Sequence, residues 1–99
     1  MKYSFHPAAE KELADAVDYY NDCQSGLGLE FAKEIYRTIQ NILLLPDAWA
    51  PLSENTRRCL TSRFPYGVIY QATDKEIFLI AVMQLNRKPD YWKGRVKGT

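Results

Sequence analysis

The chain has 99 residues, 46% of them apolar, and a net charge of +1 at pH 7. This length predicts one domain over residues 1–99, and the composition is that of a globular protein, which excludes a disordered chain. No apolar run approaches the ~20 residues of a membrane span and the N-terminus has no apolar signal segment, so we expect a cytoplasmic protein that does not associate with membranes.

The first half of the chain predicts one short strand and two amphipathic helices. Residues 2–6 alternate polar and apolar side chains, which is typical of a strand, and Pro7 suits the first turn of a helix. Apolar residues at spacings of three and four predict a helix over residues 7–23. Gly26 lies in a break, after which a second apolar stripe predicts a helix over residues 27–45. Two such helices with a short connection form an antiparallel helical hairpin.

The second half predicts a loop over residues 46–55 and three strands, over residues 57–62, 66–72 and 77–85. A turn at residues 73–76 joins the last two strands into a hairpin. The last strand is almost wholly apolar, as expected at the centre of a sheet. The element order is therefore β-α-α-β-β-β, and the sequence predicts an α+β fold in which the helical hairpin packs on one face of a mostly antiparallel sheet.

The two cysteines give no sign of a disulfide framework or a metal site. Cys23 and Cys59 are far apart in the sequence and do not have the spacing of metal ligands. We expect both to be free thiols in a reducing compartment. We therefore expect no metal and no cofactor in this protein.

The two halves of the chain differ in charge. Residues 1–56 hold four Lys or Arg and nine Asp or Glu, a net charge of −5, whereas residues 57–99 hold nine and three, a net charge of +6. This asymmetry indicates either two faces with different partners or halves that neutralise each other in the fold. Directly behind the last strand comes the basic and aromatic sequence NRKPDYW, residues 86–92. A packed core explains the strand but not this ending.

Four stretches of the chain, taken in their order and spacing, resemble the RelE/ParE superfamily of toxins from bacterial type II toxin–antitoxin systems. They are FHPAAEKELADAVDYY, GLGLEFAKEI, RFPYGVIY and AVMQLNRKPDYW, and together they extend over nearly the whole chain. The last two are most similar to the ParE-type branch and its plasmid-stabilisation relatives. One departure is Gln84, where relatives are expected to carry a histidine. Glutamine keeps a hydrogen-bonding side chain but does not titrate near neutral pH.

The resemblance implies a toxin that binds its target without cutting it. ParE-type members act on DNA gyrase and trap its cleaved-DNA state, which requires a surface rather than an acid–base set. Arginine, tyrosine and tryptophan often anchor protein interfaces, and the same mixture suits nucleic acid. The expected target-binding residues are Arg87, Lys88, Tyr91, Trp92, Lys93 and Arg95, with Lys97 beside them.

Three features of the second half of the chain have structural alternatives to a role in target binding. Tyr91 or Trp92 could instead fold back to close the core. Residues 93–99 could be a solvated tail. Arg63 is as well suited to an ion pair with a helix carboxylate, such as Asp15 or Asp18, as to a target contact.

A second implication of the resemblance is a ribosome-dependent messenger RNA endonuclease of the RelE type. Such cleavage needs a base, an acid and positive charge for the phosphorane. The weak candidates are Glu54, Arg63, Tyr70 and Tyr91, together with Tyr66 and the single histidine His6, and phosphate could be held by Arg57, Arg58 and Arg63.

Two positions argue against the nuclease. The nuclease branch usually has a strand arginine where this chain has Gly67, and Gln84 removes the expected histidine. We therefore expect no catalytic residue, and we rank the gyrase-binding toxin first. A degenerate member that only binds an antitoxin is the third alternative.

The resemblance also implies a cognate antitoxin. Its C-terminal segment, disordered alone, would fold on binding across the helices and the sheet of the toxin. The expected contacts on this chain are Tyr19, Leu29 and Tyr36. Operator DNA would be bound only through the antitoxin, and the assembly, including a heterotetramer or a larger complex, stays open.

Overall fold

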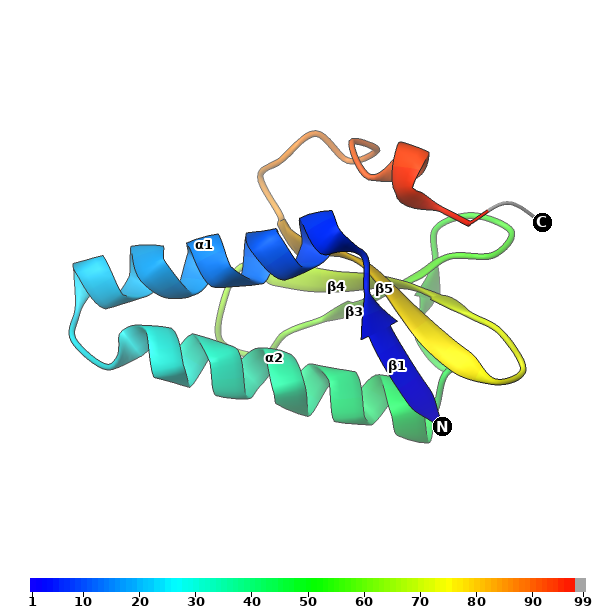
Figure 1. The fold of residues 1–99 in the computed structure, drawn as a ribbon, viewed down its shortest axis with the longest axis horizontal. Coiled ribbons are helices and arrows are strands. Elements are labelled where there is room, and N and C mark those ends of the chain that lie inside the picture. The colour runs from blue at the N-terminus through cyan, green and yellow to red at the C-terminus, as the bar shows by residue number, and fades with distance from the viewer. Residues whose placement is uncertain (98–99) are drawn as a thin grey trace.

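The computed structural model describes residues 1–97 and has seven regular elements and a closing 3₁₀ helix. Two long helices follow the first strand, and the remaining strands follow the helices, as Figure 1 shows. Within residues 1–97, no helix is long and apolar enough to cross a bilayer. The elements are β1 (Lys2–Phe5), α1 (Pro7–Cys23), α2 (Leu27–Leu44), β2 (Ala50–Pro51), β3 (Arg57–Leu60), β4 (Tyr66–Ala72), β5 (Glu76–Gln84) and the 3₁₀ helix Lys93–Arg95.

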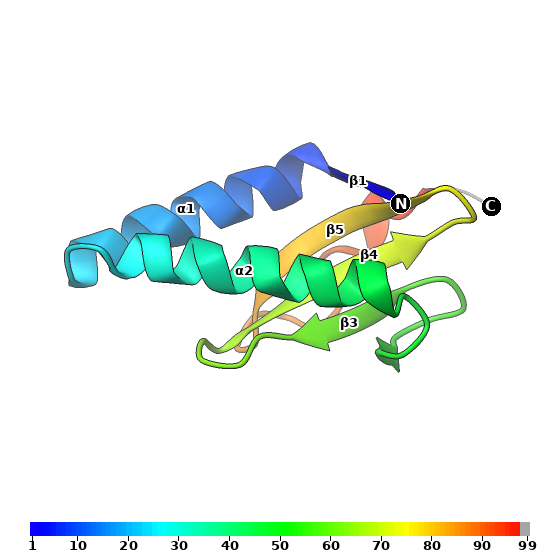
Figure 2. The ribbon, with the colours of Figure 1, turned by 90° about the horizontal axis from the view of Figure 1, so that it is seen from below.

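The five strands form one sheet in the order β1-β5-β4-β3-β2, in which only the β1–β5 pair is parallel. Helices α1 and α2 lie side by side against this sheet (Figure 2), so the predicted α+β fold is confirmed. One detail of the prediction was wrong, because the expected loop 46–55 contains β2, a strand too short to show alternation. The strand predicted over residues 57–62 ends at Leu60, and the one predicted over residues 77–85 covers Glu76–Gln84.

Side chains and a glycine define the ends of the two helices. The Nδ1 atom of His6 accepts a hydrogen bond of 3.0 Å from the Ala8 amide, so the single histidine caps α1. Gly26, between the helices, has φ of +88°, a left-handed conformation that disfavours other residues. The Asn21 side chain then accepts from the Gly28 amide at 2.8 Å and ties the two helices together.

The sheet separates two clusters of buried side chains. The larger one lies between the helices and the sheet, and it joins residues such as Phe31 and Ile39 of α2 to Leu79 of β5. The smaller cluster lies on the opposite face of the sheet. It contains Ile69, Phe78, Ile80, Ala81, Met83 and Trp92, with Tyr91 and Val96 packed against it.

The C-terminal segment, residues 85–97, covers this second face. Trp92 is only 3% exposed, so the alternative in which it folds back onto the core is the one that the structure shows. The amide of Gln71 pairs with the backbone of Lys97 through two hydrogen bonds, of 3.1 and 3.3 Å. Residues 93–97 are therefore docked rather than a solvated tail, while residues 98–99 of that expectation lie outside the described residues.

A β-bulge lies at the centre of β5. Tyr70 of β4 pairs with Leu79 and Ile69 pairs with Ala81, which leaves Ile80 as an extra residue without a partner. As a result, Ile80 and Ala81 both belong to the second cluster, although neighbouring residues of a regular strand point to opposite faces. The bulge also shifts which backbone groups of β5 point toward the free edge beyond β1.

The close approach of the two helices predicts a strict requirement for glycine at position 28. A Cβ atom there would lie 2.4 Å from the Val17 carbonyl oxygen and 2.6 Å from Asn21 Cγ. We expect Gly28→Ala to lower the free energy of unfolding by about 2 kcal/mol through overpacking. The control is Gly94→Ala, because nothing lies within 4 Å of the added Cβ. Denaturation in urea measures both variants, and equal midpoints for the two would contradict the packing described.

Candidate functional site

The edge of β5 loses its neighbouring strand halfway along. β1 pairs with β5 only from Glu76 to Leu79, and the His6 amide donates the last bond of this edge, of 2.9 Å, to the Leu79 carbonyl. Two side chains replace the missing strand beyond this point. The Val82 amide donates to Glu12 at 3.1 Å, and Arg95 donates to the Ile80 carbonyl at 3.1 Å. Backbone groups that the fold removes from water need such partners.

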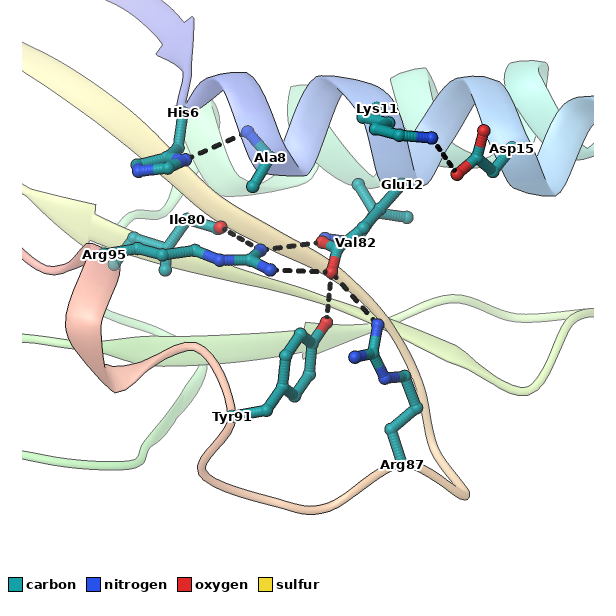
Figure 3. A network of polar contacts seen from close by, with 10 residues as sticks. All are labelled: His6, Ala8, Lys11, Glu12, Asp15, Ile80, Val82, Arg87, Tyr91 and Arg95. Carbon is teal, nitrogen blue, oxygen red and sulfur yellow. Dashed lines mark hydrogen bonds and ion pairs between the residues drawn. The ribbon is translucent and has the colours of Figure 1, made fainter.

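Glu12 of α1 is the centre of this arrangement (Figure 3). Arg95 contacts both of its carboxylate oxygens, at 3.0 and 3.1 Å, and the Tyr91 hydroxyl donates to it at 2.8 Å. Arg87 is the outermost donor, at 3.4 Å. The Glu12 and Arg95 side chains are 13% and 17% exposed, so this ion pair is largely withdrawn from water. We call Glu12, Arg87, Tyr91 and Arg95 the Glu12 network.

The Glu12 network sets the protonation of Tyr91 and Arg95. Burial raises the pKa of Tyr91, and the hydrogen bond to Glu12 raises it further, against the opposing effect of Arg87 and Arg95. Burial alone would lower the pKa of Arg95, but its contacts with Glu12 outweigh this effect and the pKa is raised. Tyr91 is therefore a neutral hydrogen-bond donor at neutral pH, and Arg95 is a cation.

The C-terminal segment contains all six residues that the sequence predicts to contact the target, but it presents them unequally. The Arg87 guanidinium stacks on the Tyr91 ring, with its Cζ atom 3.8 Å from the ring centroid. Lys88 is exposed, and Lys93 forms a long ion pair of 4.0 Å with Asp90. Trp92 is buried, and its Nε1 donates to the Pro89 carbonyl at 2.8 Å. As an expected target contact Trp92 is therefore not accessible, because its ring packs in the second cluster.

The residues considered for RNA cleavage do not come together. Tyr70 is fully buried, burial raises its pKa to about 12, and its hydroxyl donates to the Pro46 carbonyl. Glu54 lines a separate polar pocket formed by the loop before β3. Tyr91 belongs to the Glu12 network, on the other side of the sheet from Tyr70. Within residues 1–97, no group of three or more His, Cys, Asp or Glu side chains is placed to hold a metal ion.

The three arginines considered for phosphate do not share one site, because Arg57 and Arg58 are neighbours on β3 with side chains on opposite faces of the sheet. Arg63 pairs with Glu30 at 3.1 Å, so the alternative of an ion pair with a helix carboxylate is the one that the structure shows, although the partner is on α2 and is neither Asp15 nor Asp18. The sequence could not show that the β3–β4 connection returns to the first turn of α2. Arg57 donates to the Trp49 carbonyl at 2.8 Å, while Arg58 follows it on β3 and lies over Gly67.

A groove of about 210 Å³ lies beside the Glu12 network. It runs between α1, the start of β4 and the end of β5, and Gln84 is one of the residues that line it. The residues around it are Glu12, Asp15, Ala16, Tyr19, Tyr66, Val82, Gln84 and Arg87.

The residues expected to contact an antitoxin are on the helices. Tyr19, Leu29 and Tyr36 are 61%, 58% and 44% exposed. All three are therefore accessible to a partner in the structure. Glu12 is the site residue that sequence reasoning missed, because the helical pattern places it among the polar residues of the outer face of α1.

Comparison with known proteins agrees with this architecture. Residues 3–89 match the family model described as "ParE toxin of type II toxin-antitoxin system, parDE". The chain is 27% identical over 94 residues to the protein named Toxin ParE2 in two strains of Mycobacterium tuberculosis, CDC 1551 / Oshkosh and ATCC 25618 / H37Rv, a match that covers 94% of this chain and 90% of each relative. Among solved structures, a chain of the "Chromosomal ParDE TA system from P. aeruginosa" has a similar fold. The TM-score is 0.75 at 16% identity, over 86% of this chain and 96% of that chain.

The environments of Tyr70 and Tyr91 predict an alkaline loss of stability. An unfolded tyrosine ionises near ~10, whereas folded Tyr70 ionises at about 12. The unfolded state therefore loses its proton first, so the free energy of unfolding is unaffected below pH ~10 and falls as the pH rises from ~10 toward 12. Tyr70→Phe should reduce this fall, and Tyr36→Phe on the surface is the control.

Denaturant titrations at several pH values, with tyrosinate absorbance, measure this effect. Ionisation of all seven tyrosines in one step near pH ~10, with the fold intact, would show that Tyr70 and Tyr91 are not held as described.

Proposed function

Because the chain belongs to the ParE toxin family of type II toxin–antitoxin systems, we propose that it inhibits growth by binding DNA gyrase and that a cognate antitoxin neutralises it. Gyrase is inferred as the target from the resemblance to ParE-type toxins. The site of action in this proposal is the cytoplasm, where gyrase and the DNA are.

The observation that carries the proposal is the cationic surface of the C-terminal segment, in which Arg87 and Lys88 are exposed. Arg95 is paired with Glu12, and Lys97 lies 3.8 Å from Glu76. Residues 85–97 contain five Lys or Arg and a single acid, Asp90. Arg87 is held between the Glu12 carboxylate and the Tyr91 ring, yet its side chain remains 50% exposed. An arginine that is fixed before binding loses less conformational entropy when it meets a partner. Arginine and tyrosine are also enriched among the residues that anchor protein interfaces.

Binding rather than RNA cleavage is supported by the arrangement of the titratable groups. A general base must be able to accept a proton near neutral pH. The buried hydroxyl of Tyr70 and the hydroxyl of Tyr91 both have raised pKa values, so neither is suited to this role. Glu54 and Arg63 lie on separate loops and do not share a pocket. Adhesion of the cationic surface needs none of these groups to act together.

The antitoxin is proposed to bind a different surface. Tyr19, Leu29 and Tyr36 are exposed on the helices, and of these three Tyr19 alone lines the groove that Arg87 also lines. A disordered antitoxin segment that folds across α1 and α2 would cover these apolar side chains. Operator DNA would then be reached only through the antitoxin, in a heterotetramer or a larger assembly.

The function is tested by offering the purified chain both targets. With gyrase, ATP and supercoiled plasmid, we expect linearised plasmid to accumulate, and with translating ribosomes we expect intact transcripts. Transcripts cut on ribosomes while gyrase works normally would replace the proposal with the RelE-type endonuclease. Activity in neither assay, without growth arrest on induction, would leave a chain that only binds antitoxin.

The cationic surface predicts a variant that separates toxicity from neutralisation. Arg87→Ala with Lys88→Ala should abolish growth inhibition, because it removes the held guanidinium and its exposed neighbour. Antitoxin affinity should stay within about twofold, since two of the three expected contacts, Leu29 and Tyr36, lie outside the groove that Arg87 lines and separate sites behave independently. The control is Lys2→Ala with Lys75→Ala, which removes two charges from exposed residues outside the segment.

Growth curves on induction and calorimetric titration with the antitoxin measure the two properties. Equal loss of toxicity and of antitoxin affinity in Arg87→Ala with Lys88→Ala would assign these side chains to the antitoxin surface instead.

A further inference from the structure

We propose that Glu12 is the positioning residue of the toxin's target-binding surface: its carboxylate fixes Arg87 and Tyr91 in the arrangement that meets the target. Glu12 itself is on α1 and only 13% exposed, so its effect on the target passes through these two side chains. The inference rests on the proposed function in that it assumes the C-terminal segment to be the part that inhibits growth.

The Glu12 carboxylate receives more hydrogen-bond contacts than it has lone-pair directions. Five contacts converge on it: one from the Val82 amide, two from Arg95, one from the Tyr91 hydroxyl and one from Arg87. A carboxylate offers about four lone-pair directions. The Arg87 contact is the longest, at 3.4 Å. Arg87 is therefore oriented by Glu12 while several of its N–H groups stay available to an outside acceptor.

The carboxylate also neutralises two cations that would otherwise repel each other. The guanidinium carbons of Arg87 and Arg95 lie 3.8 and 5.0 Å from the centroid of the same Tyr91 ring. Stacking on an aromatic face favours each arginine alone. Two positive charges beside one ring repel each other, and a nearby negative charge offsets this repulsion. Glu12 is that charge, since it contacts both guanidinium groups and the hydroxyl of the ring.

The backbone of the C-terminal segment has anchors that do not involve Glu12. At its start, the Leu85 amide donates to the Pro65 carbonyl at 2.9 Å. In its middle, Trp92 is buried in the second cluster. At its end, Lys97 pairs with the Gln71 side chain. Removing the charge of Glu12 should therefore leave the segment docked while Arg87 and Tyr91 lose their fixed orientation. This outcome distinguishes a positioning role from a merely structural one.

Glu12→Gln in the full chain tests the inference, with Glu10→Gln as the matched control. Glu10 is on the same helix and exposed, and the chemical change is the same. Charge-assisted hydrogen bonds are worth enough for about a tenfold weakening of growth inhibition when this one is lost. The toxicity of Glu10→Gln should equal that of the wild type. The indole N–H resonance of Trp92, which is separate from that of Trp49, should keep its wild-type chemical shift in both variants and so report a docked segment.

A direct measurement follows the arginine side chains themselves. In the wild type, nitrogen relaxation at Arg87 Nε should show order approaching that of Arg95, and Glu12→Gln should abolish it at Arg87. Free rotation of Arg87 in the wild type would overturn the inference without any variant. A folded Glu12→Gln chain with full toxicity would also overturn the inference. The same holds if the loss of toxicity in Glu12→Gln is fully explained by the fraction of molecules in which Trp92 has left the second cluster.

The growth readout keeps this test separate from the proposed target. If the wild type arrests growth but leaves gyrase unaffected, the gyrase proposal fails. A selective loss of toxicity in Glu12→Gln would still support the positioning role, whatever the target is.

Discussion

The free edge of β5 is the constraint on which the rest of the structure depends. β1 turns into α1 after Phe5, and the β-bulge at Ile80 directs backbone groups toward the edge that β1 has left. Glu12 and Arg95 fill this gap, one from α1 and one from the C-terminal segment. Both side chains are partly buried, at 13% and 17% exposed, so each charge depends on the other for much of its stabilisation. The helix, the central strand and the chain end therefore meet at one carboxylate.

A second glutamate, on the other helix, also accepts a hydrogen bond from a backbone amide. Glu34 of α2 is almost fully buried, and it accepts a hydrogen bond of 3.0 Å from the Ser62 amide, just beyond the end of β3. Each helix thus contributes one carboxylate to a backbone amide, in β5 for Glu12 and in the β3–β4 connection for Glu34. Apolar packing holds the helical hairpin on the sheet, while these two polar contacts fix its direction. A small domain buries a limited apolar area, so such contacts have a large share in specifying the fold.

The elements of regular length could be predicted from the sequence, because their periodicity is local. Both helices and the long strands lie within one or two residues of their expected bounds. β2 was missed, since two residues carry no pattern. The partner of Arg63 and the burial of Trp92 could not be found either, because both depend on which face of the sheet a distant segment meets. Glu12 looks like any polar residue of an amphipathic helix until the chain end returns to it. The opposite charges of the two halves were the only signal of that contact.

The account predicts that the C-terminal segment and the helices meet different partners. A photo-reactive amino acid in place of Lys88, and in a second variant in place of Tyr36, tests this most directly in bacterial cells that also contain the antitoxin. Both positions are exposed, so each reports what touches its own surface. Capture of gyrase from position 88 and of the antitoxin from position 36 is the predicted result. Capture of gyrase from position 36, with none from position 88, would contradict it.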